Sequence, residues 1–448
     1  NISAASNSAL ELATGEFAVL LDHDDELSED ALFRVASEIV QFPETDMIYS
    51  DEDKIDERGR RSEPKFKPDF SRDLFYSVNL VTHLSAYRTE ILRKIGGFRL
   101  GYEGSQDYDL ALRVVETISE DRIRHIPHIL YHWRAISGSV AMAGKEKPYA
   151  HERAREALRS HFERTGKQAE VFESVNDLHR VRYALPEMLP TVGLIMRTDG
   201  NSIPPDNVLK AFIGNTDYPN YEMIVISENG PQYHVSNAKF VLRNNRSDAA
   251  KLNVGAAHTD AEILCFIDWR YMPLNADWLR ELVSFAYQPE IGAVGGKLLG
   301  RKNQVVDGGL IVGIGGTAGV AHNGFPRAAA GNMSRNVLVG NYSAVSAACM
   351  AIRRDAFEAA GGFDDENLPN QLFDVDLCLR LHKQGLRTVF TPHAELVLRN
   401  DVGSPANMSP ASPVESKYFQ EKWKCYIEND PLYNPNLSKN DGTFSVKL

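Results

Sequence analysis

Four carboxylates stand within five residues of the sequence, in the segment DHDDE at residues 22–26. Four apolar residues, 18–21, come directly before them, which is typical of a buried strand that ends at Asp22. Carboxylates packed this closely repel one another, and a bound cation would remove that cost. The segment therefore predicts one of two structures: a divalent metal site on oxygen ligands, or a solvated acidic loop that caps the following helix.

Two other acid-rich motifs do not fit this segment. An EF-hand loop requires glycine at its sixth position and glutamate at its twelfth, and the sequence has Leu27 and Phe33 there. A phosphatase of the haloacid dehalogenase type would carry DxDx followed by Thr or Val, and the sequence has Glu26 at that last position. Neither class of site is expected here.

A second pair of acids, Asp107 and Asp109, lies in the segment EGSQDYDL. Side chains two residues apart on a helix do not share a face. Asp109 suits the first turn of the predicted helix, where the helix dipole favours an acid. Asp107 is then free to face a crevice as a general base, and the alternative is that it caps the helix.

The elements that must position these acids occur twice, because the chain repeats itself. GEFAVLLDHDDELSEDAL (15–32) matches AEILCFIDWRYMPLNADW (261–278), and YRTEILRKIGGF (87–98) matches IRRDAFEAAGGF (352–363), in the same order. Each copy alternates strands with helices, which predicts an α/β fold with a largely parallel sheet. Ligand sites in such sheets lie at the carboxyl ends of the strands, where the acidic segment stands.

The repeat divides the chain into predicted domains at residues 1–166 and 191–448, joined by a linker at 167–190. The second copy has about 78 residues between Thr191 and Asp268, whereas 21 residues precede Asp22. A βαβ unit takes roughly 30 residues or more. The sequence therefore predicts that the first domain lacks an opening strand–helix–strand segment, and that a chain beginning at Asn1 binds its ligand weakly or not at all.

Composition excludes several classes of protein. The net charge is −12 and no strongly basic run is present, which argues against a nucleic-acid partner. No apolar run approaches the roughly 18 residues of a membrane span. The four cysteines form no CxxC pair, which argues against structural zinc and favours a reduced compartment. The expected location is the cytoplasm, including the inner face of the membrane through peripheral association.

Taken together, the motifs resemble bacterial family 2 glycosyltransferases, in the tandem form met among O-antigen and surface-polysaccharide enzymes. The motifs that carry this resemblance are, in chain order, LLDHDDEL, YSDEDK, KPDFSRDL, SQDYDLALR, LYHWR, TDYPNYE, GAVGGKLL, FDVDLCLRL and DPLYNPNLS. The resemblance implies two GT-A domains in tandem, a nucleotide-sugar donor, a divalent metal and inversion at the anomeric carbon.

The resemblance also implies roles for individual residues. Asp22 and Asp24 would form the DxD metal pair, completed by His132 of LYHWR, and Asp107 would be the catalytic base. The candidate substrate-binding residues are Asp25, Asn7, Glu103, Gln106, Trp133 and Arg134. The segment SDEDK (50–54) is also a candidate for contact with the acceptor or the donor, and the alternative is that it is a solvated strand end. The expected metal is Mn²⁺ or Mg²⁺, the donor a UDP- or dTDP-sugar, and the acceptor lipid-linked or an oligosaccharide.

The second copy has lost part of this chemistry. Asp268 aligns with Asp22, but Arg270 stands opposite Asp24, and a guanidinium is a permanent cation without an acceptor atom. Val397 falls opposite His132. Asp374 remains as the counterpart of the predicted base. The sequence therefore predicts a degenerate second domain in which Asp268 and Asp374 are remnants.

The predicted function is metal-dependent, inverting transfer of a hexosyl or deoxyhexosyl group to a growing bacterial surface polysaccharide, carried out by the first domain. One alternative is a non-catalytic carbohydrate-binding or scaffold protein in which both domains are impaired. A metal-dependent phosphohydrolase is a more distant alternative. Metal-dependent transfer that is lost in Asp24→Ala would separate the first possibility from the other two.

Overall fold

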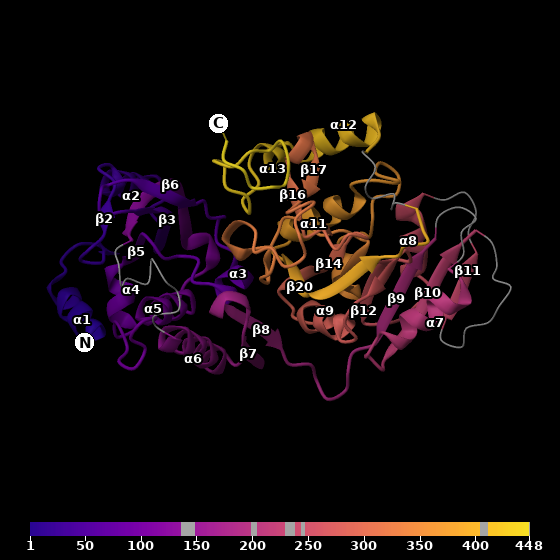
Figure 1. Cartoon of the computed structure of the whole chain (residues 1–448), viewed down its shortest axis with the longest axis horizontal. Helices are drawn as coiled ribbons and strands as arrows, with labels where there is room; N and C mark the ends of the chain where they lie inside the picture. The colour runs from indigo at the N-terminus through magenta and orange to yellow at the C-terminus, as the bar shows by residue number, and fades with distance from the viewer. Residues whose placement is uncertain (136–147, 199–203, 229–237, 243–246, 404–410, 448) are drawn as a thin grey trace. The chain divides into compact units, whose positions relative to one another are not determined.

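The computed structural model describes residues 1–135, 148–198, 204–228, 238–242, 247–403 and 411–447. Its contacts divide the chain into two compact units (Figure 1). The first unit consists of Asn1–Tyr183 with Leu432–Leu437, and the second of Ala184–Pro431 with Ser438–Leu448. No helix among the described residues is long and apolar enough to cross a membrane.

The first unit is a mixed sheet with helices around it. Its strands are β1 (Phe17–Leu20), β2 (Glu26–Leu27), β3 (Met47–Ile55), β4 (Arg61–Lys65), β5 (Ser85–Arg88) and β6 (Ile123–Arg134), in the order β1-β5-β3-β6-β2, with β4 paired to β3. Its helices are α1 (Ile2–Leu12), α2 (Ala31–Gln41), α3 (Arg72–Ser77), α4 (Thr89–Lys94), α5 (Gln106–Val115) and α6 (Pro148–Thr165). The predicted linker holds a hairpin of β7 (Ala169–Glu173) and β8 (His179–Tyr183), so the first unit extends beyond the predicted boundary.

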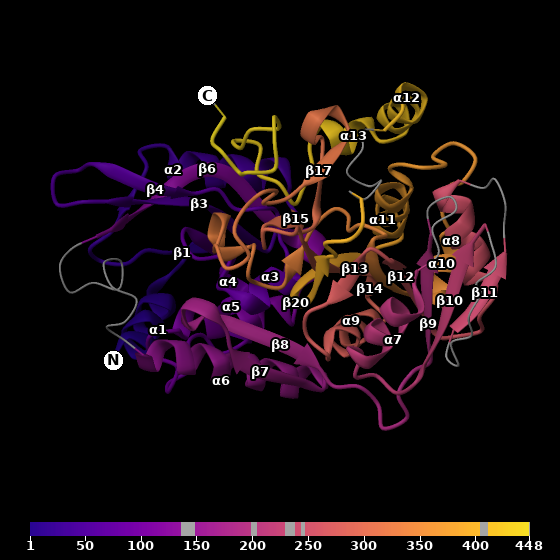
Figure 2. The same cartoon turned by 45° about the vertical axis from the view of Figure 1, so that its right-hand side comes forward.

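The second unit repeats this strand order. Its strands β12 (Ile263–Asp268), β19 (Cys349–Arg353), β14 (Ile291–Leu299), β20 (Arg387–Leu398) and β13 (Tyr271–Pro273) follow one another as β1, β5, β3, β6 and β2 do. Three further strands, β9 (Val192–Arg197), β10 (Tyr221–Ser227) and β11 (Ala238–Leu242), extend the sheet beyond β12 and lie side by side in Figure 2. Among the described residues of the first unit, β1 has no such parallel neighbours.

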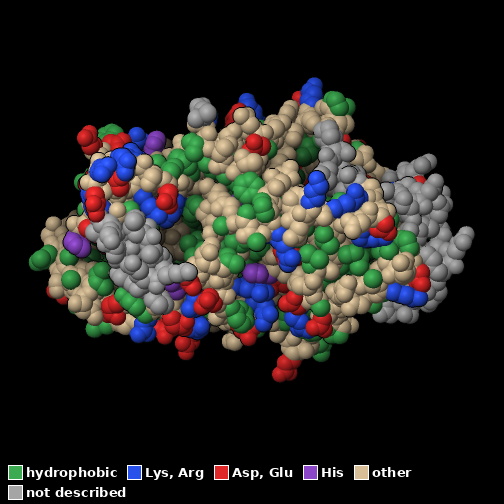
Figure 3. Space-filling model, viewed as in Figure 1, with side chains coloured by type: hydrophobic (Ala, Val, Ile, Leu, Met, Phe, Trp, Pro, Cys, Tyr) green, Lys and Arg blue, Asp and Glu red, His purple; other side chains and the backbone are tan. Residues whose placement is uncertain are grey.

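The remaining elements of the second unit surround this sheet. The short strands are β15 (Val305–Asp307), β16 (Leu310–Val312), β17 (Ala318–Val320) and β18 (Gly340–Asn341). The helices are α7 (Asp206–Gly214), α8 (Asp248–Ala256), α9 (Trp278–Ala286), α10 (Arg354–Ala359), α11 (Phe373–Lys383), α12 (Pro413–Lys422) and α13 (Lys424–Glu428). Figure 3 shows acidic and basic side chains interspersed over the described part of one face of the molecule.

Neither sheet is as parallel as the sequence predicts. In the first unit β3 and β6 run parallel, whereas β5 runs antiparallel to both β1 and β3. In the second unit β19 likewise runs antiparallel to β12 and β14. A strand that enters the sheet without a crossover helix can pair in either direction, so the alternation of strands and helices does not fix its direction.

The core of the first unit lies between α2 and the sheet. Ala31 and Val35 of α2 are buried against Ile48 of β3 and Leu130 of β6. These apolar side chains recur every three or four residues on the helix and at alternate positions on the strands. The packing fixes the start of α2, and with it the acidic segment that leads from β1 into this helix.

A segment near the end of the chain completes the first unit. Asn434 is buried, and its amide donates hydrogen bonds of 2.9 Å to a carboxylate oxygen of Asp51 and 2.8 Å to the carbonyl of Lys67. Asp51 also accepts a hydrogen bond of 2.9 Å from His125. Asp51 of the SDEDK segment is therefore a buried carboxylate that organises the interior of the unit, and this part of the segment is not a solvated strand end.

Candidate active site

A cleft of about 970 Å³ opens in the first unit at the carboxyl end of β1. The predicted site residues that line this cleft are Asp22, Asp24, Gln106, Asp107 and Trp133. They come from the segment after β1, from the first turn of α5 and from the end of β6. The structure thus brings the two acidic motifs of the sequence into one cavity.

Asp22 and Asp24 concentrate negative charge at the edge of this cleft. Burial raises the pKa of Asp22 above its usual value, and the neighbouring charges of Asp107 and Asp24 raise it further, although His83 opposes them. Among the described residues, the carboxylate of Asp22 accepts no hydrogen bond. His23 lies 3.6 Å from Asp24, but its side chain is 97% exposed. This charge is only partly neutralised by the protein.

Hard divalent cations suit such a site, because they prefer carboxylate oxygens and keep open positions for water or phosphate. No group of three or more His, Cys, Asp and Glu side chains in the described part of the chain is placed to hold a metal ion. A cation here would therefore take two ligands from the protein, Asp22 and Asp24, and fill its other positions from substrate and water. Sites that bind Mg²⁺ through one or two carboxylates and substrate phosphates have this composition.

Asp25 and Arg134 hold the acidic loop in place. Tyr131 donates a hydrogen bond of 2.5 Å to Asp25, whose other oxygen accepts one of 2.8 Å from the backbone N–H of Arg134. The Arg134 guanidinium donates to the backbone carbonyl of Asp24 at 2.5 Å and pairs with Glu26. Neither Asp25 nor Arg134 lines the cleft, so the structure gives them a supporting place beside Asp24, and their predicted contact with substrate stays a prediction.

His132 is not among the residues that line the cleft. Its Nδ1 lies 2.6 Å from a carboxylate oxygen of Asp53, which in turn accepts a hydrogen bond of 2.6 Å from Arg61. Successive side chains of a strand point to opposite faces, and in β6 it is Tyr131 and Trp133 that face the cleft. The predicted role of His132 as a metal ligand therefore stays a prediction without geometric support.

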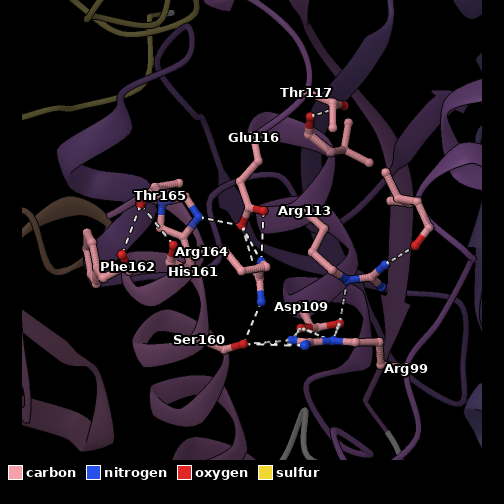
Figure 4. A network of polar contacts seen from close by, with 12 residues as sticks. Arg99, Asp109, Arg113, Glu116, Thr117, Ser160, His161, Phe162, Arg164 and Thr165 are labelled. Carbon is pink, nitrogen blue, oxygen red and sulfur yellow. Dashed lines mark hydrogen bonds and ion pairs between the residues drawn. The ribbon is translucent and has the colours of Figure 1, made fainter. Parts of the chain in front are cut away.

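Asp107 and Asp109 diverge as the sequence predicts. Asp107 faces the cleft and accepts a hydrogen bond of 2.9 Å from the side-chain amide of Asn79. Asp109 is fully buried between Arg99 and Arg113, where Arg113 donates to it at 3.0 Å (Figure 4). Asp109 thus stabilises the interior, and Asp107 is the acid of this helix that a substrate can reach.

Asn7 and Glu103 contribute to structure at the rim. Asn7 receives the backbone N–H of Phe98 and donates to its carbonyl, both at 2.8 Å. Asn253 forms the same pair of bonds with Phe363 in the second unit, which indicates a clamp that both copies share. Glu103 accepts hydrogen bonds from Asn1 and from the backbone of Gly101. Neither Asn7 nor Glu103 lines the cleft, and their predicted contact with substrate stays a prediction.

Sequence reasoning missed three residues of this site. Asn79 and His83, in the segment NLVTHL, and Tyr131 of β6 all lie at the cleft or hold a residue that does. The signal in the sequence was weak: one amide and one imidazole stand within an otherwise apolar stretch.

In the second unit, the strand-end acid is neutralised by arginine. The guanidinium of Arg270 donates two hydrogen bonds to the carboxylate of Asp268, one of 2.8 Å from Nε and one of 2.5 Å from Nη2. Arg197 forms an ion pair of 2.5 Å with Asp248. Asp374 is held by the backbone N–H groups of Ala347 and Val375, and burial raises its pKa.

Family models match both halves of the chain. The model described as "Glycosyl transferase family 2" matches residues 1–96, and the one described as "Glycosyltransferase like family 2" matches residues 206–429, half of the chain. The matches fall in the two units, one in each.

Two curated relatives align with nearly the whole chain. The protein y4gI of Sinorhizobium fredii is 38% identical over 99% of this chain and 51% of its own length. The O-antigen biosynthesis protein RfbC of Myxococcus xanthus is 34% identical over 97% of this chain and 35% of its own length. The chain thus spans about half of the first relative and about a third of the second.

Similar solved structures are more distant. They include GalNAc-T7 with UDP, GalNAc and Mn²⁺, at 13% identity and a TM-score of 0.42 over 58% of this chain and 53% of that one. The mannosyltransferase PcManGT of Pyrobaculum calidifontis with GDP-Man and Mn²⁺ has 15% identity and a TM-score of 0.35 over 63% of this chain and 79% of that one.

The family matches and the shared strand order of the two units confirm the predicted fold class, two α/β domains of the GT-A type in tandem. They also confirm the predicted class of enzyme. The chain belongs to glycosyltransferase family 2.

Proposed function

We propose that the first unit transfers a sugar from a nucleotide-sugar donor to a growing surface polysaccharide of the O-antigen type, with inversion and with the help of a divalent metal. The observation that carries this proposal is the meeting of Asp22, Asp24 and Asp107 in one cleft. The relative from Myxococcus xanthus, an O-antigen biosynthesis protein, supports the class of product.

Asp107 is placed to act as the general base in this reaction. Its carboxylate would take the proton from an acceptor hydroxyl while that oxygen attacks the anomeric carbon and the bond from this carbon to the diphosphate oxygen breaks. One displacement of this kind inverts the anomeric centre. Asn79 holds one oxygen of Asp107 through its amide, which leaves the other oxygen for the acceptor.

Asp22 and Asp24 would hold the metal, Mn²⁺ or Mg²⁺, and a cation bound there offsets the charge that develops on the leaving diphosphate. The described part of the chain provides little positive charge for this purpose, because no Lys or Arg is among its residues that line the cleft. The donor is expected to be a UDP- or dTDP-sugar, and the acceptor a lipid-linked or free oligosaccharide.

The second unit is proposed to serve structure or polymer binding without transfer. Arg270 occupies the carboxylate of Asp268 with two hydrogen bonds, which leaves no pair of free acids for a cation at this strand end. A purely non-catalytic protein remains the alternative function.

The test is transfer itself, measured with the protein that contains these 448 residues. UDP-, GDP- and dTDP-sugars would be supplied with Mn²⁺ and a polysaccharide-precursor fraction, and the released nucleoside diphosphate would be quantified. We expect release that depends on acceptor and that is lost in Asp107→Asn but kept in Asp374→Asn. No release from any donor, or loss in Asp374→Asn alone, would contradict the proposal.

A further inference from the structure

The segment between α3 and β5 brings two polar side chains to the cleft. Asn79 binds the proposed base, and His83 lines the cavity together with Asp22 and Asp107. The carbonyls of Thr82 and His83 both accept hydrogen bonds of 2.7 Å from the buried ammonium of Lys67. The segment is therefore anchored from the interior of the unit.

The imidazole of His83 is held from behind by a buried carboxylate. Glu52 lies 3.1 Å from Nδ1 of His83 and also accepts the backbone N–H of the same residue. The side chain of Glu52 is 3% exposed and forms an ion pair of 2.6 Å with Lys65. Burial raises the pKa of Glu52, but Lys67, Lys65 and His83 outweigh burial and hold it well below its usual value. Glu52 is thus a charged acceptor.

Aromatic rings fix the plane of the same imidazole. Tyr131 stacks on His83 with ring centroids 4.6 Å apart and planes 16° apart, and Trp133 lies at 5.6 Å. The orientation of the ring is therefore set before any ligand binds, which lowers the entropic cost of a contact. Among the described residues nothing is hydrogen-bonded to Nε2 of His83.

The charges around the cleft indicate which kind of ligand group could bind Nε2 of His83. Among the residues that the structure describes, those lining the cleft include three acids and two histidines, and neither lysine nor arginine. His23 is almost fully exposed, whereas the side chain of His83 is 23% exposed and rigidly held. Among the described residues of the cleft, His83 therefore offers an entering nucleoside diphosphate an imidazole whose orientation is already fixed.

We infer that His83, oriented by Glu52, donates a hydrogen bond from Nε2 to the diphosphate of the donor. This inference rests on the proposed function and adds a specific substrate contact to it. An imidazole whose Nδ1–H is held by a carboxylate and whose second nitrogen carries a proton is an imidazolium, the form that pairs with phosphate oxygens.

Binding measurements test this role without requiring turnover. Pyrophosphate, UDP, GDP and dTDP would each be titrated calorimetrically into the full-length protein in the presence of Mn²⁺, and Mn²⁺ alone would be titrated separately. We expect His83→Ala to weaken binding of pyrophosphate and of the preferred nucleotide by about tenfold to a hundredfold, as for one lost charged hydrogen bond. His83→Gln, which keeps a donor but no charge, should recover part of the loss.

The control is His128→Gln, since His128 is exposed on β6 and lies outside the cleft. This variant, like the affinity of His83→Ala for Mn²⁺ alone, should match the wild type. If His83→Ala bound diphosphates as tightly as the wild type, the proposed contact would be wrong. If His83→Ala lost binding of Mn²⁺ alone, the contact would also be wrong, and His83 would instead be a metal ligand. A wild-type protein that binds no nucleotide and transfers no sugar would instead overturn the proposed function itself.

Discussion

Three carboxylates meet in the cleft of the first unit, and their surroundings give them different tasks. Asp107 accepts a hydrogen bond from the amide of Asn79, which fixes one oxygen and leaves the other for a substrate. Asp22 has a raised pKa because burial and neighbouring acids disfavour its charge. A bound cation would stabilise the charged form of the Asp22 carboxylate. The pair Asp22 and Asp24 is thus suited to a metal and Asp107 to proton transfer.

Replacement of the base separates proton transfer from binding. Asp107→Asn keeps the shape and the bond to Asn79 but cannot take a proton, so we expect turnover to fall by at least about 10²-fold. The KM for the donor should change little, since in the proposed mechanism the diphosphate is bound through the metal and not through Asp107. Steady-state kinetics over a range of donor concentrations would measure both. Wild-type turnover in this variant would remove Asp107 from the mechanism.

The sequence predicted the order of the strands and helices better than it predicted which side chains line the cleft. The repeat, the strand before Asp22 and the divergence of Asp107 from Asp109 follow from periodicity and from matched motifs. The direction of β5 does not, because strand pairing is decided by tertiary contacts. The place of His132 shows a related limit: a shift of one residue along a strand moves a side chain to the other face, and in β6 it is Tyr131 and Trp133 that line the cleft. Asn79 and His83 lie in a loop between α3 and β5, and the path of a loop cannot be predicted from hydrophobic periodicity.

The junction of α5 and α6 gives a prediction for stability against pH. Glu116 accepts hydrogen bonds from Arg164 and His161, the latter at 2.8 Å (Figure 4). Burial raises the pKa of Glu116, but Arg164 and His161 outweigh burial and lower it from 4.5 to about 2. A carboxyl with a depressed folded pKa stabilises the fold above its unfolded pKa, and this contribution disappears as the pH falls through the folded pKa.

Glu116→Gln should therefore lower the free energy of unfolding by about 1.5–3 kcal/mol at pH 7, the usual size for hydrogen bonds to a charged group. The difference from the wild type should narrow as the pH falls from 4.5 to about 2. Thermal unfolding at a series of pH values would measure it. Glu163→Gln, an exposed change on α6, is the control. A difference that stays constant down to pH 2 would show that charge on Glu116 contributes nothing.

At the scale of the whole molecule, the two units share one strand order but differ in the residues that surround their strand-end acids. Each unit builds the sheet in which a strand-end acid stands beside an antiparallel strand. In the first unit these acids face an open cleft, and in the second Arg270 takes the place of a cation beside Asp268. A duplicated domain can thus keep its fold after internal ion pairs replace its site.

Loss of Arg270 should affect stability and not catalysis. Arg270→Ala removes the closest ion-pair partner of Asp268, whose side chain is 1% exposed, and leaves it with Arg197 at 3.9 Å and with the backbone N–H of residue 270. Breaking a buried pair in this way costs about 3–5 kcal/mol. We expect a lower midpoint of denaturation, with transfer per folded molecule unchanged, measured by denaturant titration beside kinetics. Unchanged stability together with lost transfer would place the reaction in the second unit.

The most direct measurement of the central claim is metal-dependent transfer by Asp24→Ala. The assay would follow sugar transfer by the full-length protein as Mn²⁺ is added back after chelation, with Glu29→Ala as an exposed control in the same segment. The account predicts that wild type and Glu29→Ala recover activity with added Mn²⁺, whereas Asp24→Ala folds normally and stays at least about 10²-fold less active. Full activity of the wild type in excess chelator, or of Asp24→Ala at any Mn²⁺ concentration, would contradict it.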